Sequence, residues 1–179
     1  MTQTARIYGE SLYELARDEG LGEEIFHQLQ MVSALFRENP QYAELLAMPS
    51  LPKRERCGVL NQAFQDRVHP YLLNFLKILV EHGTIRQLPG CEAVYRQGYY
   101  EDNGILEVTA VTAVPLSEQM REKLSARLAD KTGKTILLQN QVDPNVLGGV
   151  RLEIADKRLD GTIRSRLDKI QASLRSKVL

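Results

Sequence analysis

The spacing of apolar side chains changes once along this chain, and that change constrains the fold more than any other feature of the sequence. Up to about residue 100, apolar residues recur every three or four positions, which is the period of one face of an α-helix. The polar cluster Glu101-Asp102-Asn103-Gly104 ends this pattern, and the β-rich run ILEVTAVTAV follows it. We therefore predict an α+β protein with two domains, residues 1–103 and residues 104–179.

The first domain is predicted to be a six-helix bundle, because short connections favour antiparallel helices that pack on one another. Glycines follow several of the helical patterns and prolines begin others, as at helix ends elsewhere. The most apolar helix is expected to lie centrally. The six predicted helices are Thr4 to Glu19, Leu21 to Arg37, Pro40 to about Met48, Pro52 to about Phe64, Pro70 to His82, and about Thr84 to Tyr100.

The second domain is predicted to be a small α/β unit in the order strand, helix, two strands, helix, with one exposed sheet face or edge. Its elements are expected from Ile105, at Ser117 to Lys131, at Thr135 to Val142, at Gly149 to Ile154, and from Gly161 onward. In the third strand, alternation predicts that Arg151 and Glu153 point outward.

Composition narrows the possible functions. The formal net charge is zero, but Lys and Arg number 10 against 14 Asp and Glu up to Asn103, and 13 against 9 afterwards. This asymmetry indicates either two surfaces that meet different partners or an ordinary solvated surface, and it is too small for a nucleic-acid stripe. Cys57 and Cys91 stand alone, so we expect neither a disulfide framework nor a zinc site.

No segment of the sequence predicts targeting or membrane insertion. The start, MTQTARIYGESL, lacks the basic and apolar regions of a signal peptide, so the mature chain is expected to begin here. The most apolar run, YLLNFLKILV, has about half of the ~20 residues that a membrane-spanning helix needs. It is predicted to be a core helix.

Motifs for catalysis or cofactor binding are weak. DKTGKT (residues 130–135) ends like a phosphate-binding loop, but Leu128 replaces the required first glycine and the expected order is helix, turn, strand. His27, His69 and His82 fall on three separate helices, and KRER (residues 53–56) is interpreted as a solvated helix face. We predict no catalytic residue, cofactor, metal ion or small-molecule substrate.

The run DPNVLGGVRLEIADKRLDGTIRSRL, from Asp143, is explained by architecture. Gly148 and Gly149 allow positive backbone angles, and Asp156-Lys157 is expected to form a hairpin turn. Asp160 is expected to cap the last helix, of which Gly161 is the first residue. The aspartates lack the alternating spacing of a calcium loop.

Three stretches of the sequence resemble the delta subunit of the F-type ATP synthase, called the oligomycin-sensitivity-conferring protein in mitochondria. They are ARIYGESLYELA from Ala5, FLKILVEHGTIRQLP from Phe75, and VDPNVLGGVRLEIADKRLDGTIRSRL from Val142. Gly9 departs from the alanine usual in the family, which costs the helix up to ~1 kcal/mol. Thr84 stands where an arginine is common.

The resemblance implies a non-catalytic stator subunit that takes part in ATP synthesis and proton transport by linking the catalytic head to the peripheral stalk. In the family, a groove between the first and fifth helices accepts the N-terminal helix of an alpha subunit. Here that groove corresponds to Tyr8, Ser11, Leu12 and Leu15, facing Phe75, Ile78 and Leu79. The alternative, that these residues are interior core, has about equal weight for any one of them.

The resemblance also implies that the second domain meets the ends of the stalk b subunits. The cations of the last helix, Arg164, Arg166, Lys169, Arg175 and Lys177, suggest an acidic or amphipathic stalk helix as the partner. The expected location is peripheral, at the cytoplasmic face of a bacterial inner membrane. A soluble adaptor that binds RNA or another protein is the alternative reading.

Overall fold

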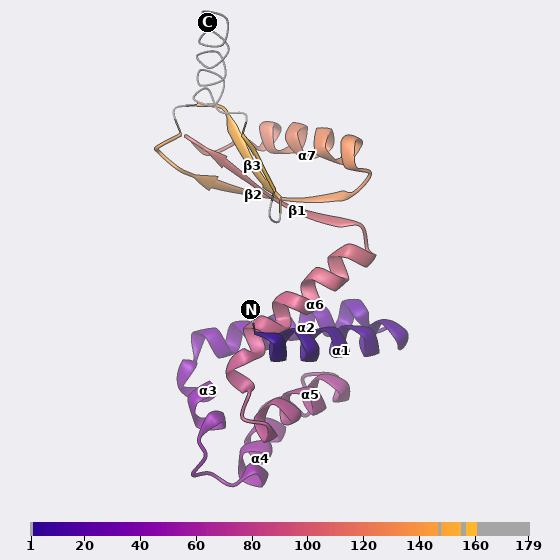
Figure 1. Cartoon of the computed structure of the whole chain (residues 1–179), viewed down its shortest axis with the longest axis vertical. Coiled ribbons are helices and arrows are strands. Elements are labelled where there is room, and N and C mark those ends of the chain that lie inside the picture. The colour runs from indigo at the N-terminus through magenta and orange to yellow at the C-terminus, as the bar shows by residue number, and fades with distance from the viewer. Residues whose placement is uncertain (1, 147, 155–156, 161–179) are drawn as a thin grey trace, which may run out of the picture. The chain divides into compact units, whose positions relative to one another are not determined.

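The computed structural model describes residues 2–146, 148–154 and 157–160 of the chain (Figure 1). It divides into two units, Met1–Tyr100 and Glu101–Leu179. The described residues contain seven α-helices and a small sheet, so the mostly helical α+β class predicted from the sequence is confirmed.

The first unit is helical, and local sequence signals account for most of its helix ends. Thr2 caps the first helix by accepting a hydrogen bond from the amide of Ala5 at 3.2 Å, and prolines begin the third and fifth helices. Gly20 and Gly83 follow helices at φ +69°, a backbone angle that favours glycine. The α-helices are α1 (Gln3–Asp18), α2 (Gly22–Glu38), α3 (Pro40–Ala47), α4 (Lys53–Phe64), α5 (Pro70–Glu81) and α6 (Leu88–Asp102).

The start of α6 differs from the prediction of a continuous helix from about Thr84. A 3-10 turn, η1 (Ile85–Gln87), precedes it, and α6 begins only at Leu88. Pro89 explains the break, because its nitrogen has no hydrogen to donate to the carbonyl four residues earlier.

One hydrophobic cluster fills this unit, and α5 supplies six of its buried side chains. Aromatic rings gather at one end, where Phe26 stacks on Tyr99 with ring centroids 4.6 Å apart. The buried Tyr95 hydroxyl donates to the Gly22 carbonyl oxygen at 2.9 Å, so the polar end of this large side chain is satisfied.

Glycines allow α1 and α6 to pack closely. A Cβ built on Gly9 would lie 2.7 Å from the Cys91 carbonyl oxygen and 2.7 Å from Val94 Cβ. A Cβ on Gly98 would lie 2.7 Å from the Tyr13 ring. Gly9 therefore has a packing role, and treating it only as a cost to helix propensity is incomplete.

Arg56 corrects the prediction that KRER is a solvated face. Its side chain is buried, and its guanidinium donates to the carbonyl oxygens of Leu46 at 2.9 Å, Leu51 at 3.1 Å and Val80 at 3.3 Å. Leu46 and Val80 lie near the C-terminal ends of α3 and α5, where carbonyl groups lack partners within the helix, and Leu51 lies in the connection before α4. Only the other three residues of the motif are exposed.

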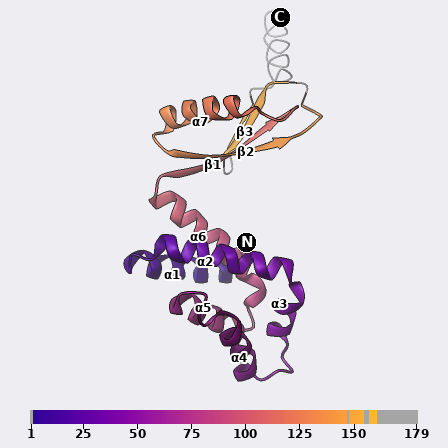
Figure 2. The same ribbon diagram turned by 180° about the vertical axis from the view of Figure 1, so that it is seen from behind.

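The second unit contains β1 (Ile105–Thr112), α7 (Glu118–Thr132), β2 (Thr135–Val142), β3 (Val150–Ile154) and β4 (Lys157–Asp160). The strand order is β2-β1-β3-β4, with β1 and β2 parallel and the other two pairs antiparallel. Figure 2 shows the same unit from behind, with α7 lying along the sheet. Ser117 caps α7, and Gly133 ends it at φ +67° before β2 begins, which is the helix, turn, strand order expected for DKTGKT.

One detail of the predicted sheet is wrong. Lys157 pairs with Ile154 as the first residue of a fourth strand, so it does not belong to the turn. In β3 every residue is half-buried, and the prediction that Arg151 and Glu153 share one face agrees with the contact between their side chains. Their side chains hydrogen-bond each other at 3.2 Å, which shields both charges.

Candidate partner-binding site

The predicted groove residues lie on α1 and α5, which run next to each other in both ribbon views (Figures 1 and 2). The Tyr8 ring of α1 faces the His82 ring at the end of α5, with centroids 6.4 Å apart. His69, at the start of α5, accepts a hydrogen bond from the amide of Tyr71 through Nδ1 and so helps to fix the first turn.

Burial divides the seven predicted residues. Leu12, Phe75 and Leu79 are 3%, 7% and 0% exposed and belong to the hydrophobic core. Leu15 and Ile78 are each 42% exposed, and several other large apolar side chains of this unit are similarly exposed, such as Met31 at 42%. The other two also reach the surface, since Ser11 is exposed and Tyr8 half-buried.

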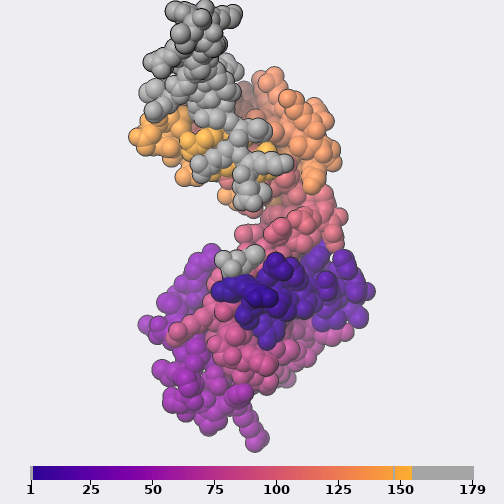
Figure 3. Space-filling view, viewed as in Figure 1, coloured from indigo at the N-terminus to yellow at the C-terminus, as the bar shows by residue number. Residues whose placement is uncertain are grey.

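The sequence analysis missed a further member of this surface. Ile7 is 52% exposed, and it stands one and two helical turns before Ser11 and Leu15. The spacing i, i+4, i+8 was the signal that would have found it. We use the name apolar stripe for four exposed residues of the two helices, Ile7, Ser11 and Leu15 on α1 and Ile78 on α5, of which Ser11 is polar. Figure 3 shows part of α1 open on the visible face of the helical unit.

Charged side chains lie beside the apolar stripe. On α1, Glu10, Glu14 and Asp18 are exposed at helical spacing, and Glu10 contacts Arg6 at 3.5 Å. These exposed carboxylates would attract an amphipathic segment with a basic flank, with modest energy because solvent screens them.

Groups suited to catalysis or metal binding do not gather here. Within the described residues no group of three or more His, Cys, Asp or Glu is placed to hold a metal ion. The histidines have local contacts: His27 lies 3.9 Å from Glu23 one turn earlier on α2, and His82 caps α5. An acid-base pair with an oriented partner therefore does not form from the described histidines.

The structural residues of the Asp143 run are described in part. Gly148 and Gly149 have φ +143° and +86°, angles that glycine adopts readily. The backbone amide and then the side-chain amide of Asn145 donate to Asp143, which lowers the pKa of that carboxyl. Asp160 is the last residue of β4, and the predicted helix from Gly161 lies outside the described residues.

A helical unit with large apolar side chains exposed on several helices, beside a small α/β unit, is a candidate for docking to other proteins. Among the described residues, no helix combines the length and the apolar character needed to cross a bilayer.

Comparisons with known proteins give the family. Residues 4–174 match the family described as ATP synthase delta (OSCP) subunit, and the chain belongs to that family. It is 35% identical to an ATP synthase subunit delta of Alkaliphilus oremlandii over 172 residues, which is 96% of this chain and 95% of the relative. It is 30% identical to one of Clostridioides difficile over 171 residues, or 95% and 94% of the two chains.

A solved structure supports the fold independently. A chain of the Toxoplasma gondii mitochondrial ATP synthase hexamer superposes with a TM-score of 0.67 at 21% identity, covering 97% of this chain and 98% of that one. The family is a structural component of the peripheral stalk, or stator, of the ATP synthase and has no catalytic role of its own. It is thus a peripheral part of a membrane-bound complex.

Proposed function

We propose that the chain joins the catalytic head of a bacterial F-type ATP synthase to its peripheral stalk, at the cytoplasmic face of the inner membrane. Residues 1–103 act as one six-helix module that binds the N-terminal helix of an alpha subunit. Residues 104–179 bind the ends of the stalk b subunits. The link holds the head still while the rotor turns, so that proton-driven rotation is coupled to ATP synthesis.

The apolar stripe is the observation that carries the alpha-subunit assignment. A helix that docks in an apolar groove presents anchors at i, i+3, i+4 and i+7, and Ile7, Leu15 and Ile78 offer matching exposed apolar surface. Leu12, Phe75 and Leu79 form the floor beneath it, because they are buried in the unit itself. Six of the seven predicted residues thus divide into a contact layer and a supporting layer, and the seventh, Tyr8, is half-buried.

The contact layer is small, so individual anchors are expected to matter. Anchors that become fully buried carry most of the binding energy of an interface, and the polar residues around them contribute much less. Placing a carboxylate at such an anchor would bury a charge without a partner, which costs several kcal/mol. Ile78 is the best position for this change, because its side chain is 42% exposed and so lies outside the hydrophobic core of the helical unit.

The test uses the full chain and a peptide from the N-terminus of the cognate alpha subunit. Ile78→Glu should weaken peptide binding by at least about a hundredfold, or ~2.7 kcal/mol, while the far-UV circular dichroism and the unfolding midpoint stay close to wild type. Leu45→Glu on α3 is the matched control, because Leu45 is a similarly exposed leucine, at 37%, outside the apolar stripe. Equal binding by all three proteins would remove the assignment.

Binding of RNA is the contrasting outcome. If the purified chain bound RNA with an affinity that fell steeply as the salt concentration rose, an RNA-binding adaptor would replace the stator as the proposed function. No described residue cluster favours it, since the helical unit carries more acidic than basic residues.

A further inference from the structure

The outer edge of β2 is a second surface without a partner among the described residues. β2 is the first strand in the order β2-β1-β3-β4, and no other described strand pairs with it on its outer side. A free edge exposes a row of backbone amide and carbonyl groups that another chain can pair with.

The hydrogen bonds of β2 show which of its backbone groups face outward. The amides of Thr135 and Asp143 donate to the Gly104 and Thr112 carbonyl oxygens, each at 2.9 Å, so odd-numbered positions face β1. Even-numbered positions 136, 138 and 140 must then direct their amides and carbonyls outward. The guanidinium of Arg121 reaches the Leu138 carbonyl oxygen from α7 at 3.5 Å, which agrees with that direction.

The residues of β2 itself lack the features that usually prevent strand addition, and Arg121 of α7 is the charged side chain that an added strand would displace from the Leu138 carbonyl oxygen. The strand TILLQNQV is eight residues long and contains no charged residue and no proline. Leu137 and Val142 are 41% and 43% exposed, so the strand also shows apolar surface. Natural edge strands of this length normally carry a lysine, a proline or a bulge.

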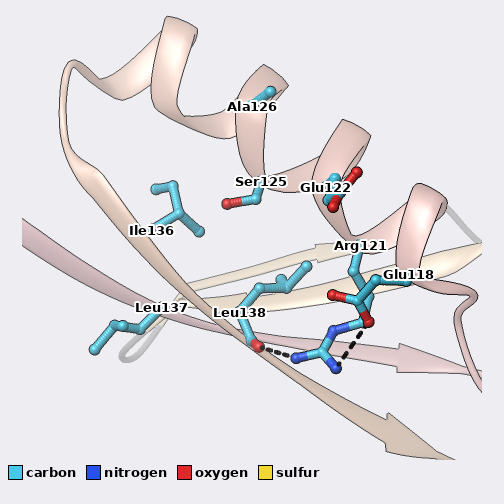
Figure 4. Close-up of a pocket in the computed structure, with 8 residues that line it drawn as sticks. All are labelled: Glu118, Arg121, Glu122, Ser125, Ala126, Ile136, Leu137 and Leu138. Carbon is cyan, nitrogen blue, oxygen red and sulfur yellow. Dashed lines mark hydrogen bonds and ion pairs between the residues drawn. The ribbon is translucent and has the colours of Figure 1, made fainter.

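A groove runs along the edge between β2 and α7 (Figure 4). It has a volume of about 590 Å³, and its apolar floor comes from Ile136 and Leu138 while α7 supplies the opposite wall. Two carboxylates, Glu118 and Glu122, lie on that wall with one guanidinium, Arg121, which contacts Glu118 at 3.7 Å. Glu122 forms no ion pair with any described residue, so the groove has an excess of negative charge.

We propose that an extended segment of a partner subunit adds to the sheet as a strand along β2. Its backbone pairs with positions 136, 138 and 140, and alternate side chains enter the groove. The segment carries small or medium apolar side chains and a lysine or arginine placed to meet Glu118 and Glu122. The proposal rests on the proposed function, because it assumes that the partner belongs to the assembled ATP synthase.

A strand is favoured over a helix as the occupant for a physical reason. A docked helix satisfies its own backbone groups and would leave the outward amides of β2 to water, whereas an added strand bonds each of them. Amide protection at alternate residues is therefore specific for strand addition and is the quantity to measure.

The experiment compares hydrogen exchange, resolved to single residues by mass spectrometry, in the isolated chain and in purified ATP synthase that contains it. Amides 136, 138 and 140 should exchange at least about tenfold more slowly in the assembled enzyme. Amides 137, 139 and 141 face β1 and should be protected in both samples. Unchanged exchange at the even positions would overturn the proposal while leaving the proposed function intact.

Other occupants give different patterns that would also overturn the proposal. Protection already present in the dilute isolated chain would mean that the chain covers its own edge. Protection that grows with the concentration of the isolated chain would indicate a second copy. If the chain were absent from the purified enzyme, the proposed function and this inference would both fail.

A charge swap tests the predicted basic side chain. Glu122→Lys should weaken binding of the full chain to enzyme depleted of this subunit by about three- to tenfold. The new lysine would repel the basic side chain of the added segment, which Glu122 attracts. Asp130→Lys makes the same charge change on an exposed part of α7 outside the groove and should leave the affinity unchanged. Equal affinities for the two variants would contradict the charge assignment.

Discussion

The two units of this protein differ in how they bury their side chains. All seven tyrosines and all four phenylalanines lie at or before residue 100, and the chain has no tryptophan. Every fully buried leucine, isoleucine and tyrosine among the described residues also lies in the helical unit. In the second unit the described core is confined to small or medium residues such as Val108, Ala110, Val111 and Leu128.

This difference indicates how each unit uses its apolar residues. The helical unit completes its own core and leaves a few large apolar side chains exposed, among them Ile7, Leu15 and Ile78, which we propose as a docking surface. The second unit leaves a strand edge, and many of its described apolar residues are half-buried instead of fully buried. We therefore expect the helical unit to be the more stable of the two in the isolated chain, with tyrosine fluorescence reporting on it alone.

The largest expected effect comes from removing a core side chain in each unit. Leu76→Ala should lower the free energy of unfolding of the helical unit by about 2–5 kcal/mol, because it opens a cavity in a close-packed core. Leu76 is 0% exposed, whereas Leu128 on α7 is 9% exposed, so Leu128→Ala should cost less. Urea unfolding followed by tyrosine fluorescence and by far-UV circular dichroism separates the units. Equal losses would contradict the contrast in packing.

The glycine contact between α1 and α6 gives the next largest effect. Gly9→Ala should destabilise the helical unit by about 1–3 kcal/mol, because the new methyl group meets a backbone carbonyl that cannot move aside. Gly58→Ala is the matched control, because Gly58 lies within α4 with nothing within 4 Å of a built Cβ. It should stabilise the same unit by up to ~1 kcal/mol through helix propensity. Thermal unfolding of both variants would show whether packing outweighs propensity at Gly9.

Periodicity and end signals predicted the helices and most of the strands because both are local properties of the sequence. The fourth strand was missed because Lys157–Asp160 is short and owes its conformation to pairing with β3. Arg56 and Gly9 were misread because their roles depend on residues far away in sequence, Val80 and Cys91 among them. No local pattern reveals such contacts.

For the candidate site, the sequence and the family resemblance indicate two helices, but not which of their side chains are exposed. Resemblance to the family indicated α1 and α5, yet Leu12, Phe75 and Leu79 have the same apolar character as Leu15 and Ile78. Which of them face inward depends on how each helix is rotated against its neighbours. Ile7 was missed for the same reason.

Raised pH should act on the helical unit. Burial raises the pKa of the Cys91 thiol from its ordinary value of 9.0 to about 11, and burial also raises the pKa of Tyr95. Between about pH 9 and 11 the unfolded chain releases the Cys91 proton first, so the free energy of unfolding falls by ~1.4 kcal/mol per pH unit. This stability is fully present below pH 9 and lost as pH approaches 11. Urea unfolding at several pH values measures the slope, and Cys91→Ala should flatten it.

Low pH should act on the second unit through Asp143. Hydrogen bonds from Asn145 lower the pKa of this carboxyl, so the stability that it gives the loop is present above its ordinary pKa and lost as pH falls through the lowered value. Nuclear magnetic resonance titration of the Asn145 amide would follow this loss. Asn145→Ala should move the titration toward the ordinary value.

Helix caps provide the smallest effect and the sharpest control for the comparison between units. Thr2 caps α1 and Ser117 caps α7, through the amides of Ala5 and Met120 at 3.2 and 3.4 Å. Each cap satisfies an amide of the first turn in the same way, so Thr2→Ala and Ser117→Ala should each cost about 0.5–1 kcal/mol. Similar losses measured by hydrogen exchange within each helix would show that local capping is independent of the unit. The caps test the same local interaction in both units. If the two capping substitutions cost similar free energies of unfolding while the two core substitutions cost different ones, the difference between the units comes from packing.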